Sequence, residues 1–450
     1  MHVHIGIDDT DSPDGLCTTY IGFLLSVRFK KLGFSFVDLP YLVRLNPNVP
    51  FKTRGNAAVS IHLDASESRV EEIRNVVEDT LSVNVMAHAK TSPGFAIVVG
   101  DVNENLKKLY LRALSEVVPL SYVKEQVEKG LYGDVEVGGL GKGRGIVGAL
   151  AAVGAYPLSI YTYELLVYRD PSERETKRLI DKSILIEIDR KYRPIVFTSY
   201  DYSEKRALAI PRGPDPVILG IRSLDVKPLQ EILSFYLHRI DGLQKVVGYA
   251  LYKTNQATNA HLTIKKSAEK IRPYDSVVME GVVVEAPVIL EGGHVGLKIC
   301  DTERCVEAMF YRETGRLNRV ARLLRPGDRV EIGGGAVPRK GLTLNVEYLR
   351  VLSVHKQVVY MNPLCPRCGA RMKSAGTGKG YKCPKCGYRS KSFSKIQREL
   401  PRILEPGLYV SSARAYRHLT KPREIEGLNS IPYEKSLLEG DFVFLSKEMY

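Results

Sequence analysis

The residues best suited to chemistry in this chain lie between His4 and Thr19, where an apolar run ends in acids and then hydroxyls. Three carboxylates, Asp8, Asp9 and Asp11, fall within four residues. Acids this close repel one another unless a cation lies among them, and Mg²⁺ prefers carboxylate oxygens. The spacing therefore predicts a magnesium site. The alternative is that these aspartates only cap a helix and close turns, which single aspartates do more often than they bind metal.

Two short elements must position these groups. Val3, Ile5 and Ile7 alternate with smaller or polar neighbours, which predicts a half-buried strand. From residue 16 the apolar spacing becomes helical, so Thr18 and Thr19 fall in the first helical turn. A hydroxyl there lies among unpaired N–H groups at the positive end of a helix, where phosphate binds favourably. Acids for a divalent cation beside such hydroxyls indicate phosphoryl chemistry.

Cys17 has the chemistry of a nucleophile and lies in the same stretch. A lone cysteine near a helix start is, however, more often a small buried apolar residue, and no histidine stands nearby in the sequence to decide between the two.

A glycine-rich segment, G-G-L-G-K-G-R-G-I-V-G-A-L-A-A-V-G, spans residues 138–154. Glycines permit the backbone conformations of an anion nest, and two basic side chains alternate with them. The segment departs from a Walker loop, because Arg and Gly stand where Lys and Ser or Thr are required. The alternative is a flexible hairpin loop followed by a packed helix. We expect a phosphate cradle formed by Gly141, Lys142, Gly143, Arg144 and Gly145.

The composition indicates several domains and a polyanionic partner. A chain of 450 residues is too long for one core, and its net charge is +14. From Met361 to Arg423 there are fifteen Lys and Arg against two acids, so one segment holds nearly all of the imbalance. No stretch approaches ~18 uninterrupted apolar residues and no signal peptide is evident, so we expect a soluble, cytoplasmic protein with no membrane contact.

The order of expected elements predicts a multidomain α+β protein. Strands and helices alternate over 1–192, which favours an α/β layer architecture. A small ferredoxin-like α+β unit is expected next. Five alternating strands with one helix before the fourth have the order of an OB-fold barrel, which commonly holds single-stranded nucleic acid. The expected domains are 1–192, 193–272 (ferredoxin-like), 273–356 (OB-fold), 360–392 (zinc ribbon) and 393–450 (a basic C-terminal extension).

Four cysteines carry the strongest single signal. Two C-x-x-C pairs, each followed by glycine, predict facing knuckles that close a tetrahedral structural zinc site. The predicted zinc ligands are Cys365, Cys368, Cys383 and Cys386. We expect the cysteines at 300 and 305 to be packed or exposed thiols and not metal ligands. Seven cysteines, with four in C-x-x-C pairs, fit a reducing compartment and a metal site better than a disulfide framework.

The basic segment continues beyond the ribbon and carries aromatic residues. A charge run is usually only a solvated face, but this one is nearly unopposed and follows a zinc module and a predicted OB-fold, which favours contact with nucleic acid. The residues expected to bind it are Arg414, Tyr416, Arg417, His418, Lys421 and Arg423.

Taken together, these motifs closely resemble the archaeal tRNA agmatinylcytidine synthetases. The resemblance covers essentially the whole chain in order and rests on I-G-I-D-D-T-D-S, T-R-G-N at 53–56, G-K-G-R-G-I-V-G-A-L-A-A, P-D-P-V-I-L-G-I-R, T-N-Q-A-T-N-A-H-L, the four-cysteine ribbon and A-Y-R-H-L-T-K-P. That family uses ATP and agmatine to convert the first anticodon cytidine of the minor isoleucine tRNA, with anticodon CAU, to agmatidine, so that AUA is read as isoleucine.

The resemblance implies specific roles. Residues 1–192 would form an ATP-dependent kinase-like domain in which the acidic cluster serves Mg²⁺ and ATP, the glycine-rich loop binds the ATP phosphates, and Thr18 becomes phosphorylated. On physical grounds alone, Thr18 and Thr19 are equivalent. The guanidinium of agmatine needs hydrogen-bond acceptors, and we expect Asn255 and Gln256 to contribute them. The later domains and the basic extension would hold the tRNA.

Two rival functions remain open from sequence. A non-catalytic OB-fold and zinc-ribbon protein that coats single-stranded nucleic acid explains the C-terminal half, but leaves the acidic cluster and the glycine-rich loop without a role. An RNA kinase without amine transfer keeps the ATP site and differs only in the amine pocket.

Overall fold

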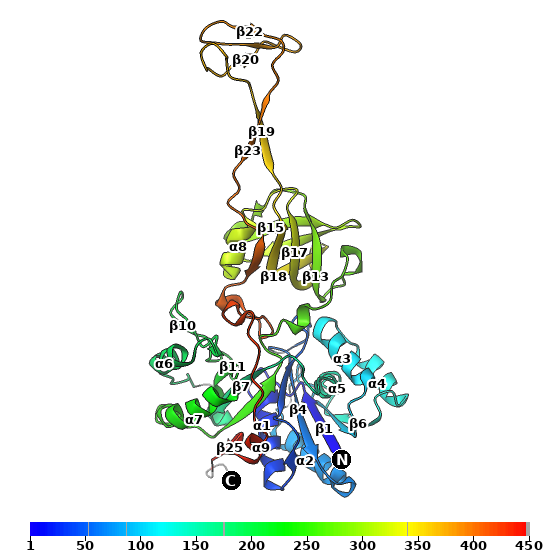
Figure 1. Ribbon diagram of the computed structural model, residues 1–450. Helices are drawn as coiled ribbons and strands as arrows, with labels where there is room; N and C mark the ends of the chain where they lie inside the picture. The colour runs from blue at the N-terminus through cyan, green and yellow to red at the C-terminus, as the bar shows by residue number, and fades with distance from the viewer. Residues whose placement is uncertain (53, 87, 174–175, 340, 447–450) are drawn as a thin grey trace.

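The computed structural model describes residues 1–450 except 53, 87, 174, 175, 340 and 447–450. A wide α/β body contains the N-terminus and the last described strand, a β-barrel lies beside it, and a small zinc-ribbon module stands at the end of a two-stranded stalk (Figure 1). The prediction of a multidomain α+β protein is confirmed.

The predicted first strand is confirmed as β1 (His2–Asp8), but it is buried on both faces. It lies between β4 (Ala57–Asp64) and β5 (Gly94–Val99), antiparallel to both. The expectation of a half-buried strand is wrong, because helices cover both sides of this sheet. On one face lie α1 (Thr18–Lys31) and α2 (Val70–Asn84); on the other lie α3 (Glu104–Ser115), α4 (Leu120–Glu128) and α5 (Ile146–Gly154).

One sheet continues through the whole body and crosses the expected boundary at residue 192. Its order is β6-β5-β1-β4-β3-β12-β7-β11-β8. Strand β7 (Thr162–Tyr168), which precedes the boundary, is hydrogen-bonded to β11 (Val217–Ser223) and β12 (Gly248–Thr254), which follow it. The ferredoxin-like topology expected for 193–272 therefore stays a prediction. The other members are β2 (Ser35–Phe36), β3 (Tyr41–Arg44), β6 (Asp134–Gly139) and β8 (Val196–Phe197), with α6 (Lys182–Tyr192) and α7 (Val226–Asp241) on the face of α1.

Two histidines are fully buried at the centre of this sheet. His4 Nδ1 and His62 Nδ1 are 2.7 Å apart, so one ring donates to the other, and Ser60 Oγ lies 3.1 Å from His62 Nε2. Burial and the nearby charge of His2 lower the pKa of His4 to about 4. Burial, and then His4, lower the pKa of His62 well below 6.5. Both rings are therefore neutral in the folded protein near pH 7.

This pair predicts a loss of stability in mild acid. The unfolded chain takes up a proton near pH 6.5, whereas folded His4 does so only near pH 4, so stability falls as the pH falls through that window. His4 alone accounts for roughly 3 kcal/mol. The urea midpoint should decrease steadily from pH 6.5 to 4. His62→Gln should flatten this dependence and the exposed His238→Gln should not; an equal dependence in all three proteins would contradict the assignment.

The β-rich region forms the closed five-stranded barrel expected for an OB-fold. The strands pair in the cycle β13-β17-β18-β16-β15 and back to β13, and α8 precedes the fourth strand in chain order. The elements are β13 (Ser276–Val283), β15 (Val295–Cys300), β16 (Cys305–Phe310), α8 (Arg316–Ala321), β17 (Arg329–Pro338) and β18 (Leu342–Ser353), with β14 (Val288–Ile289) added at an edge.

The expectation that Cys300 and Cys305 are unpaired thiols is wrong, because the structure joins them in a disulfide. They are directly opposite each other in the β15–β16 hairpin. Strand register, which the spacing of the cysteines does not reveal, brings the two sulfurs together.

The stalk pairs β19 (Gln357–Met361) with β23 (Ile396–Leu400) and joins the ribbon to the barrel (Figure 1). The ribbon consists of β20 (Lys373–Ser374), β21 (Tyr381–Lys382) and β22 (Arg389–Ser390). Only Cys365, Met372 and Cys383 form its buried centre.

Residues 393–446, the described part of the expected C-terminal extension, contact both the barrel and the body. They complete the stalk, add β24 (Gly407–Val410) to barrel strand β18, cross to the body, and end with α9 (Ser436–Glu439) and β25 (Val443–Leu445) on β12. Phe442 is fully buried in the core of the body. We call residues 411–435 the strap. The remaining short strands are β9 (Tyr200–Asp201) and β10 (Arg206–Ala207). Among the described helices, none is long and apolar enough to cross a membrane.

Candidate active site

The acidic cluster lies where β1 ends and the chain turns toward α1. Asp8 is the last residue of β1, and Asp9 has a left-handed backbone, with φ of 56°. Burial, and then the charge of Asp9, raise the pKa of Asp8 well above 3.8. Burial also raises the pKa of Asp9 to about 6, although Arg144 Nε donates to its carboxylate at 2.9 Å. The cluster therefore holds its negative charge at a free-energy cost that a cation would relieve.

Asp11 performs the capping role that was the alternative to metal binding. Its Oδ1 accepts from the backbone N–H of Thr18 at 2.7 Å, at the start of α1. The same oxygen accepts from the Thr18 hydroxyl at 3.2 Å, and Asp11 Oδ2 lies 3.4 Å from Arg54 Nε. Thr18 also accepts a hydrogen bond from Thr10 at 3.1 Å. Asp11 thus orients the Thr18 hydroxyl and is in position to receive its proton.

The three carboxylates do not converge on a single metal position. Among the described residues, the only group of at least three potential ligands with donor atoms within 4.8 Å of one another is the four cysteines. Asp9 and Asp11 are paired with arginines, whereas Asp8 has no ion pair among the described residues. This donor set does not fit an all-protein cation site. It fits Mg²⁺ that one or two carboxylates share with substrate phosphates.

Several backbone N–H groups of the glycine-rich loop are already used within the protein and are not free for an anion. Its backbone donates within the protein: Arg144 N to Ser92 Oγ, Gly145 N to the Ser92 carbonyl, and Ile146 N to the Gly143 carbonyl. The glycines serve close packing, since a Cβ on Gly145 would lie 2.4 Å from the Asp8 carbonyl oxygen. The positive charge of this loop is carried by the side chains of Lys142 and Arg144.

A chamber of about 420 Å³ opens in front of the acidic cluster, and we call it the wide chamber. Of the five loop residues expected to bind phosphate, Lys142 and Arg144 line it, whereas the three glycines do not. Arg144 also stacks on Phe51, with 5.0 Å between guanidinium carbon and ring centroid. The wall combines apolar residues, among them Leu45, Val49, Val117, Val118, Pro119 and Leu120, with a charged set (Asp8, Asp9, Asp11, Lys52, Arg54, Glu116, Lys142, Arg144).

A second cavity of about 290 Å³, the narrow chamber, adjoins the first. Four of the described lining residues belong to both: Asp11, Thr18, Arg54 and Ala57. Thr18 carries the only hydroxyl of the four. Thr19 lines the narrow chamber alone, and its hydroxyl is 3.1 Å from Cys17 Sγ. The two threonines, equivalent in the sequence, therefore differ in the structure.

Cys17 lines the narrow chamber but is not poised for nucleophilic attack. It is buried, and burial followed by the charge of Asp215 raises the pKa of its thiol to about 12. A thiol with this pKa carries almost no thiolate at neutral pH, so Cys17 acts as a small buried residue.

Asn255 and Gln256 lie behind the chambers and not on their walls. Asn255 is fully buried; its Oδ1 accepts from Arg44 N at 2.8 Å, and its Nδ2 donates to the Arg44 carbonyl and to Tyr110. Gln256 is also fully buried and donates to Glu164. Their amides are used to hold Arg44 and Glu164 in place.

Sequence reasoning missed several charged residues of the narrow chamber. Arg54 bridges Asp11 and Asp215, at 3.4 Å and 3.2 Å. Arg222 Nε lies 3.3 Å from Glu164 Oε1. Arg54 and Asp215 stand in the quoted T-R-G-N and P-D-P motifs. For Glu164, a charged residue inside the apolar run of 162–168 was the available signal, but it does not reveal which distant residue is its partner.

The strap brings several of the expected nucleic-acid residues to the body. Arg417 Nε lies 3.2 Å from Glu347 in the barrel, and its Nη1 donates to Asn48 at 2.7 Å. His418 lines the narrow chamber, where Arg222 donates to its Nδ1 at 2.8 Å. Arg414 pairs with Glu204 at 3.1 Å. Tyr416, Lys421 and Arg423 lie on the same strap.

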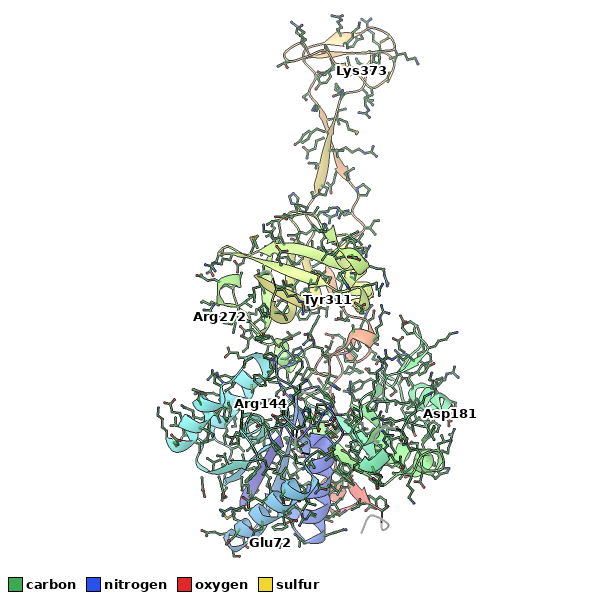
Figure 2. All side chains as sticks on the ribbon, turned by 180° about the vertical axis from the view of Figure 1, so that it is seen from behind. Glu72, Arg144, Asp181, Arg272, Tyr311 and Lys373 are labelled. Atoms are coloured by element: carbon green, nitrogen blue, oxygen red, sulfur yellow. A yellow bond between two sulfur atoms is a disulfide. The ribbon has the colours of Figure 1, made fainter. Side chains whose placement is uncertain are left out.

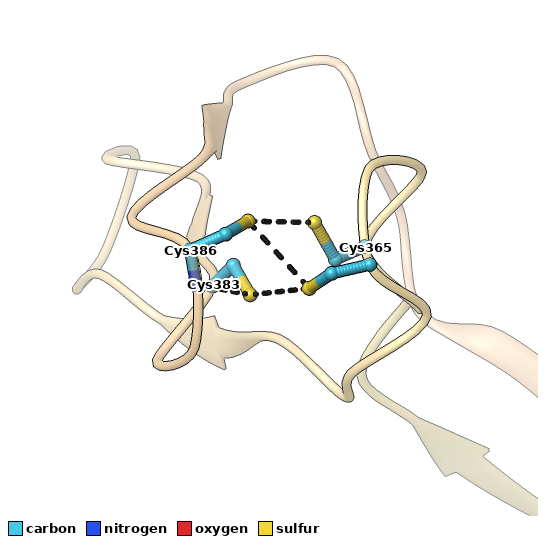
Figure 3. A group of neighbouring side chains, drawn as sticks. Cys365, Cys383 and Cys386 are labelled. Atoms are coloured by element: carbon cyan, nitrogen blue, oxygen red, sulfur yellow. Dashed lines mark hydrogen bonds between the residues drawn. The ribbon is translucent and has the colours of Figure 1, made fainter.

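The four ribbon cysteines form a compact cluster, as predicted (Figure 3). Cys365 Sγ and Cys386 Sγ are 3.5 Å apart, as are Cys368 Sγ and Cys383 Sγ. Tetrahedral Zn–S bonds of ~2.3 Å place sulfurs just under 4 Å apart, so the cluster fits zinc. Figure 2 shows how far the ribbon, marked by Lys373, lies from Arg144 in the body.

Comparison with known proteins matches the chain over its full length. Three family models match: "TiaS TCKD domain" at residues 4–69, "TiaS FLD domain" at 143–261 and "TiaS C-terminal zinc ribbon domain" at 362–404. TiaS of Thermofilum pendens, a 2-agmatinylcytidine synthetase named for an isoleucine tRNA, is 52% identical, covering 97% of this chain and 98% of its own. The enzyme of the same name from Pyrococcus horikoshii is 39% identical, covering 94% and 97%.

Solved structures with similar folds include ligand complexes. A complex of TiaS with its isoleucine tRNA and ATP has a TM-score of 0.80 at 33% identity and covers 95% of this chain and 98% of its own. A complex of TiaS with the same tRNA, AMPCPP and agmatine has a TM-score of 0.78 at 31% identity, with 94% and 96% covered. These similarities place the body, the barrel and the ribbon in one known architecture.

Proposed function

This chain belongs to the TiaS family of tRNA 2-agmatinylcytidine synthetases, and we propose that it joins agmatine to the first anticodon cytidine of the minor isoleucine tRNA, anticodon CAU, at the expense of ATP. Apart from the similarity to known TiaS proteins, one observation supports the proposal: Thr18, which carries a hydroxyl, lines both the wide and the narrow chamber. A protein that only coats nucleic acid needs neither chamber. The substrates of the proposed reaction, tRNA, ATP and agmatine, would place it in the cytoplasm.

The wide chamber suits ATP. Its apolar residues can enclose a base, and Lys52, Lys142 and Arg144 can offset the charge of a triphosphate. Asp8, which forms no ion pair among the described residues, would be the first ligand for Mg²⁺ that arrives with the nucleotide. The cation would reduce charge repulsion on the transferring phosphoryl group.

Thr18 would accept the phosphoryl group, consistent with its place on the shared wall. Asp11 Oδ1, 3.2 Å from the hydroxyl, would receive the proton as the oxygen attacks phosphorus. Arg54 is 3.4 Å from the same carboxylate and would stabilise negative charge where the two chambers meet.

The narrow chamber would hold the flipped cytosine and agmatine, because an atom within a base stack cannot be attacked. Transfer of an ATP-derived phosphoryl group to the 2-oxo oxygen, in which the bond from phosphorus to its donor oxygen breaks, makes phosphate the leaving group. The primary amine of agmatine then bonds to the ring carbon, the C–O bond breaks, phosphate departs, and the amine loses its proton. We propose Glu164 and Asp215, which line the chamber, as acceptors for the guanidinium, with Gln256 behind Glu164.

The test is mass spectrometry of an unmodified CAU-anticodon isoleucine tRNA transcript after incubation with the full chain, Mg²⁺, ATP and agmatine. The expected product carries agmatine, less water, on the anticodon cytidine. Phosphate on the RNA without the amine would support an RNA kinase instead. Tight binding to an unchanged RNA would support a binding protein.

Gly148 in α5 provides a sharp test of the acidic cluster. A Cβ at this position would lie 1.8 Å from Asp8 Oδ2, so Gly148→Ala must displace the carboxylate. A displacement near 1 Å lowers catalysis by about 10²-fold, and agmatine incorporation should fall by at least that much. Gly242→Ala, at the end of α7, is the matched control. A Cβ at this position would lie 3.3 Å from the nearest atom, the His238 carbonyl oxygen, so this variant should remain active. Full activity in Gly148→Ala would argue against a role for Asp8.

A further inference from the structure

A third cavity of about 280 Å³ adjoins both chambers, and we call it the basic recess. It shares Lys52 with the wide chamber, and shares Arg44, Gly55 and His418 with the narrow one. Arg417 of the strap completes its charged wall. None of the described residues that line it is acidic, so the recess favours an anion.

The cations of the recess are only partly neutralised by the protein. Arg44 Nε is buried and has no hydrogen-bond partner among the described residues. Burial lowers the pKa of Lys52, and the charge of Arg417 lowers it further. Arg417 pairs with Glu347, outside the recess, but that carboxylate also accepts from His261 at 3.0 Å. A bound anion would relieve this repulsion.

Gly55 creates the space in which two donors meet. A Cβ at this position would lie 2.7 Å from Arg44 Nη1 and 2.9 Å from His418 Nε2. A guanidinium only donates, so the bond from Arg222 makes His418 Nδ1 an acceptor and places the proton of the neutral ring on Nε2. Gln256 Oε1 lies 3.0 Å from the same Nδ1, but the charged donor dominates. Nε2–H and Arg44 thus face the same empty position.

We infer that the basic recess binds a phosphodiester of the RNA backbone next to the target cytidine, and so positions that nucleotide with its base in the narrow chamber. The inference rests on the proposed function. Three observations support it: the recess opens beside the narrow chamber, its donors converge over Gly55, and the strap that supplies Arg417 and His418 leads directly from the barrel. Figure 1 shows this red-brown segment descending from the barrel onto the body.

The phosphates of ATP are the other source of the same chemistry, because Lys52 also lines the wide chamber. The backbone phosphate is favoured, since Arg44, Gly55 and His418 belong to the chamber on the opposite side of Thr18 from the ATP site. The experiment must therefore change the RNA phosphate and the protein independently.

The test uses the full chain and tRNA ligated from synthetic fragments, with one neutral methylphosphonate either directly 5′ or directly 3′ of the target cytidine. With wild-type protein, one of these should raise the tRNA Kd and KM by about 10-fold or more, as expected for a lost charged hydrogen bond. Arg417→Gln should show a similar loss on normal tRNA and little further loss on that methylphosphonate. Arg417→Lys should recover most of the affinity.

Arg414→Gln, on the same strap but outside the recess, is the matched control, and its loss should add fully to that of either methylphosphonate. Additive effects for Arg417→Gln at both positions would overturn the inference. So would a raised ATP KM in Arg417→Gln with no effect of either methylphosphonate, which would assign the recess to ATP. Failure of wild-type protein to add agmatine to normal tRNA would refute the proposed function, whereas the Kd measurements would still decide the recess.

Discussion

Replacing Thr18 by valine should reduce agmatine incorporation by at least about 10³-fold, the scale of losing an essential nucleophile. Valine preserves the shape of the side chain and removes only the hydroxyl that Asp11 holds at 3.2 Å. The backbone N–H of residue 18 can still donate to Asp11, so the start of α1 should survive. The measurements are tRNA modification and, with ATP alone, phosphorylation of the intact protein by mass spectrometry.

Thr19→Val is the matched control, because its hydroxyl contacts Cys17 Sγ and lies outside the wide chamber. The Thr19 carbonyl, which accepts from the hydroxyls of Tyr168 and Tyr252, is unchanged by this substitution. We expect phosphorylation and most of the activity to persist. Normal activity in Thr18→Val, or equal losses in both variants, would contradict a specific role for the Thr18 hydroxyl.

The part of the site that the sequence predicted is the part that is local. Strand β1, the turn after it and the first turn of α1 follow from periodicity, glycine and proline within about twenty residues. The ribbon is similarly local, because two short knuckles determine its ligands. The structure confirms the arrangement of both segments.

The rest of the site depends on contacts between residues far apart in the chain. The narrow chamber combines Arg54, Glu164, Asp215 and His418, which the β-sheet and the strap bring together. Nothing in the local pattern around His418 predicts that it contacts Arg222 at the wall of a cavity, because a basic run is normally solvated. Strand pairing decides such proximity, and one sequence does not reveal it.

The role of a glycine also cannot be predicted from the local sequence. The run 138–145 resembles a phosphate nest, and the composition alone supports that interpretation. In the structure, Gly148 makes room for the Asp8 carboxylate and Gly145 for the Asp8 carbonyl. Whether a glycine serves backbone conformation, ligand access or close packing depends on its neighbours across the fold.

Replacing Cys383 by serine should release zinc and weaken tRNA binding strongly, while ATP binding remains unchanged. The hydrophobic cluster of the ribbon has only three buried members, too few for the ribbon to fold without a metal that supplies several kcal/mol or more. Loss of its fixed geometry would scatter the basic residues around β20–β22. The tRNA Kd should rise by ~10-fold or more, and its dependence on salt should become less steep.

Cys305→Ser is the matched control, because it removes a cysteine of the barrel disulfide but none of the zinc ligands. It should retain zinc and most of the tRNA affinity. The stalk separates the ribbon from the wide chamber (Figure 1), so ATP affinity should be equal in all three proteins. A parallel loss of ATP binding in Cys383→Ser would mean that the ribbon supports the nucleotide site. Equal and persistent ATP binding would instead separate the two tasks, with the ribbon holding the tRNA and the body performing the chemistry.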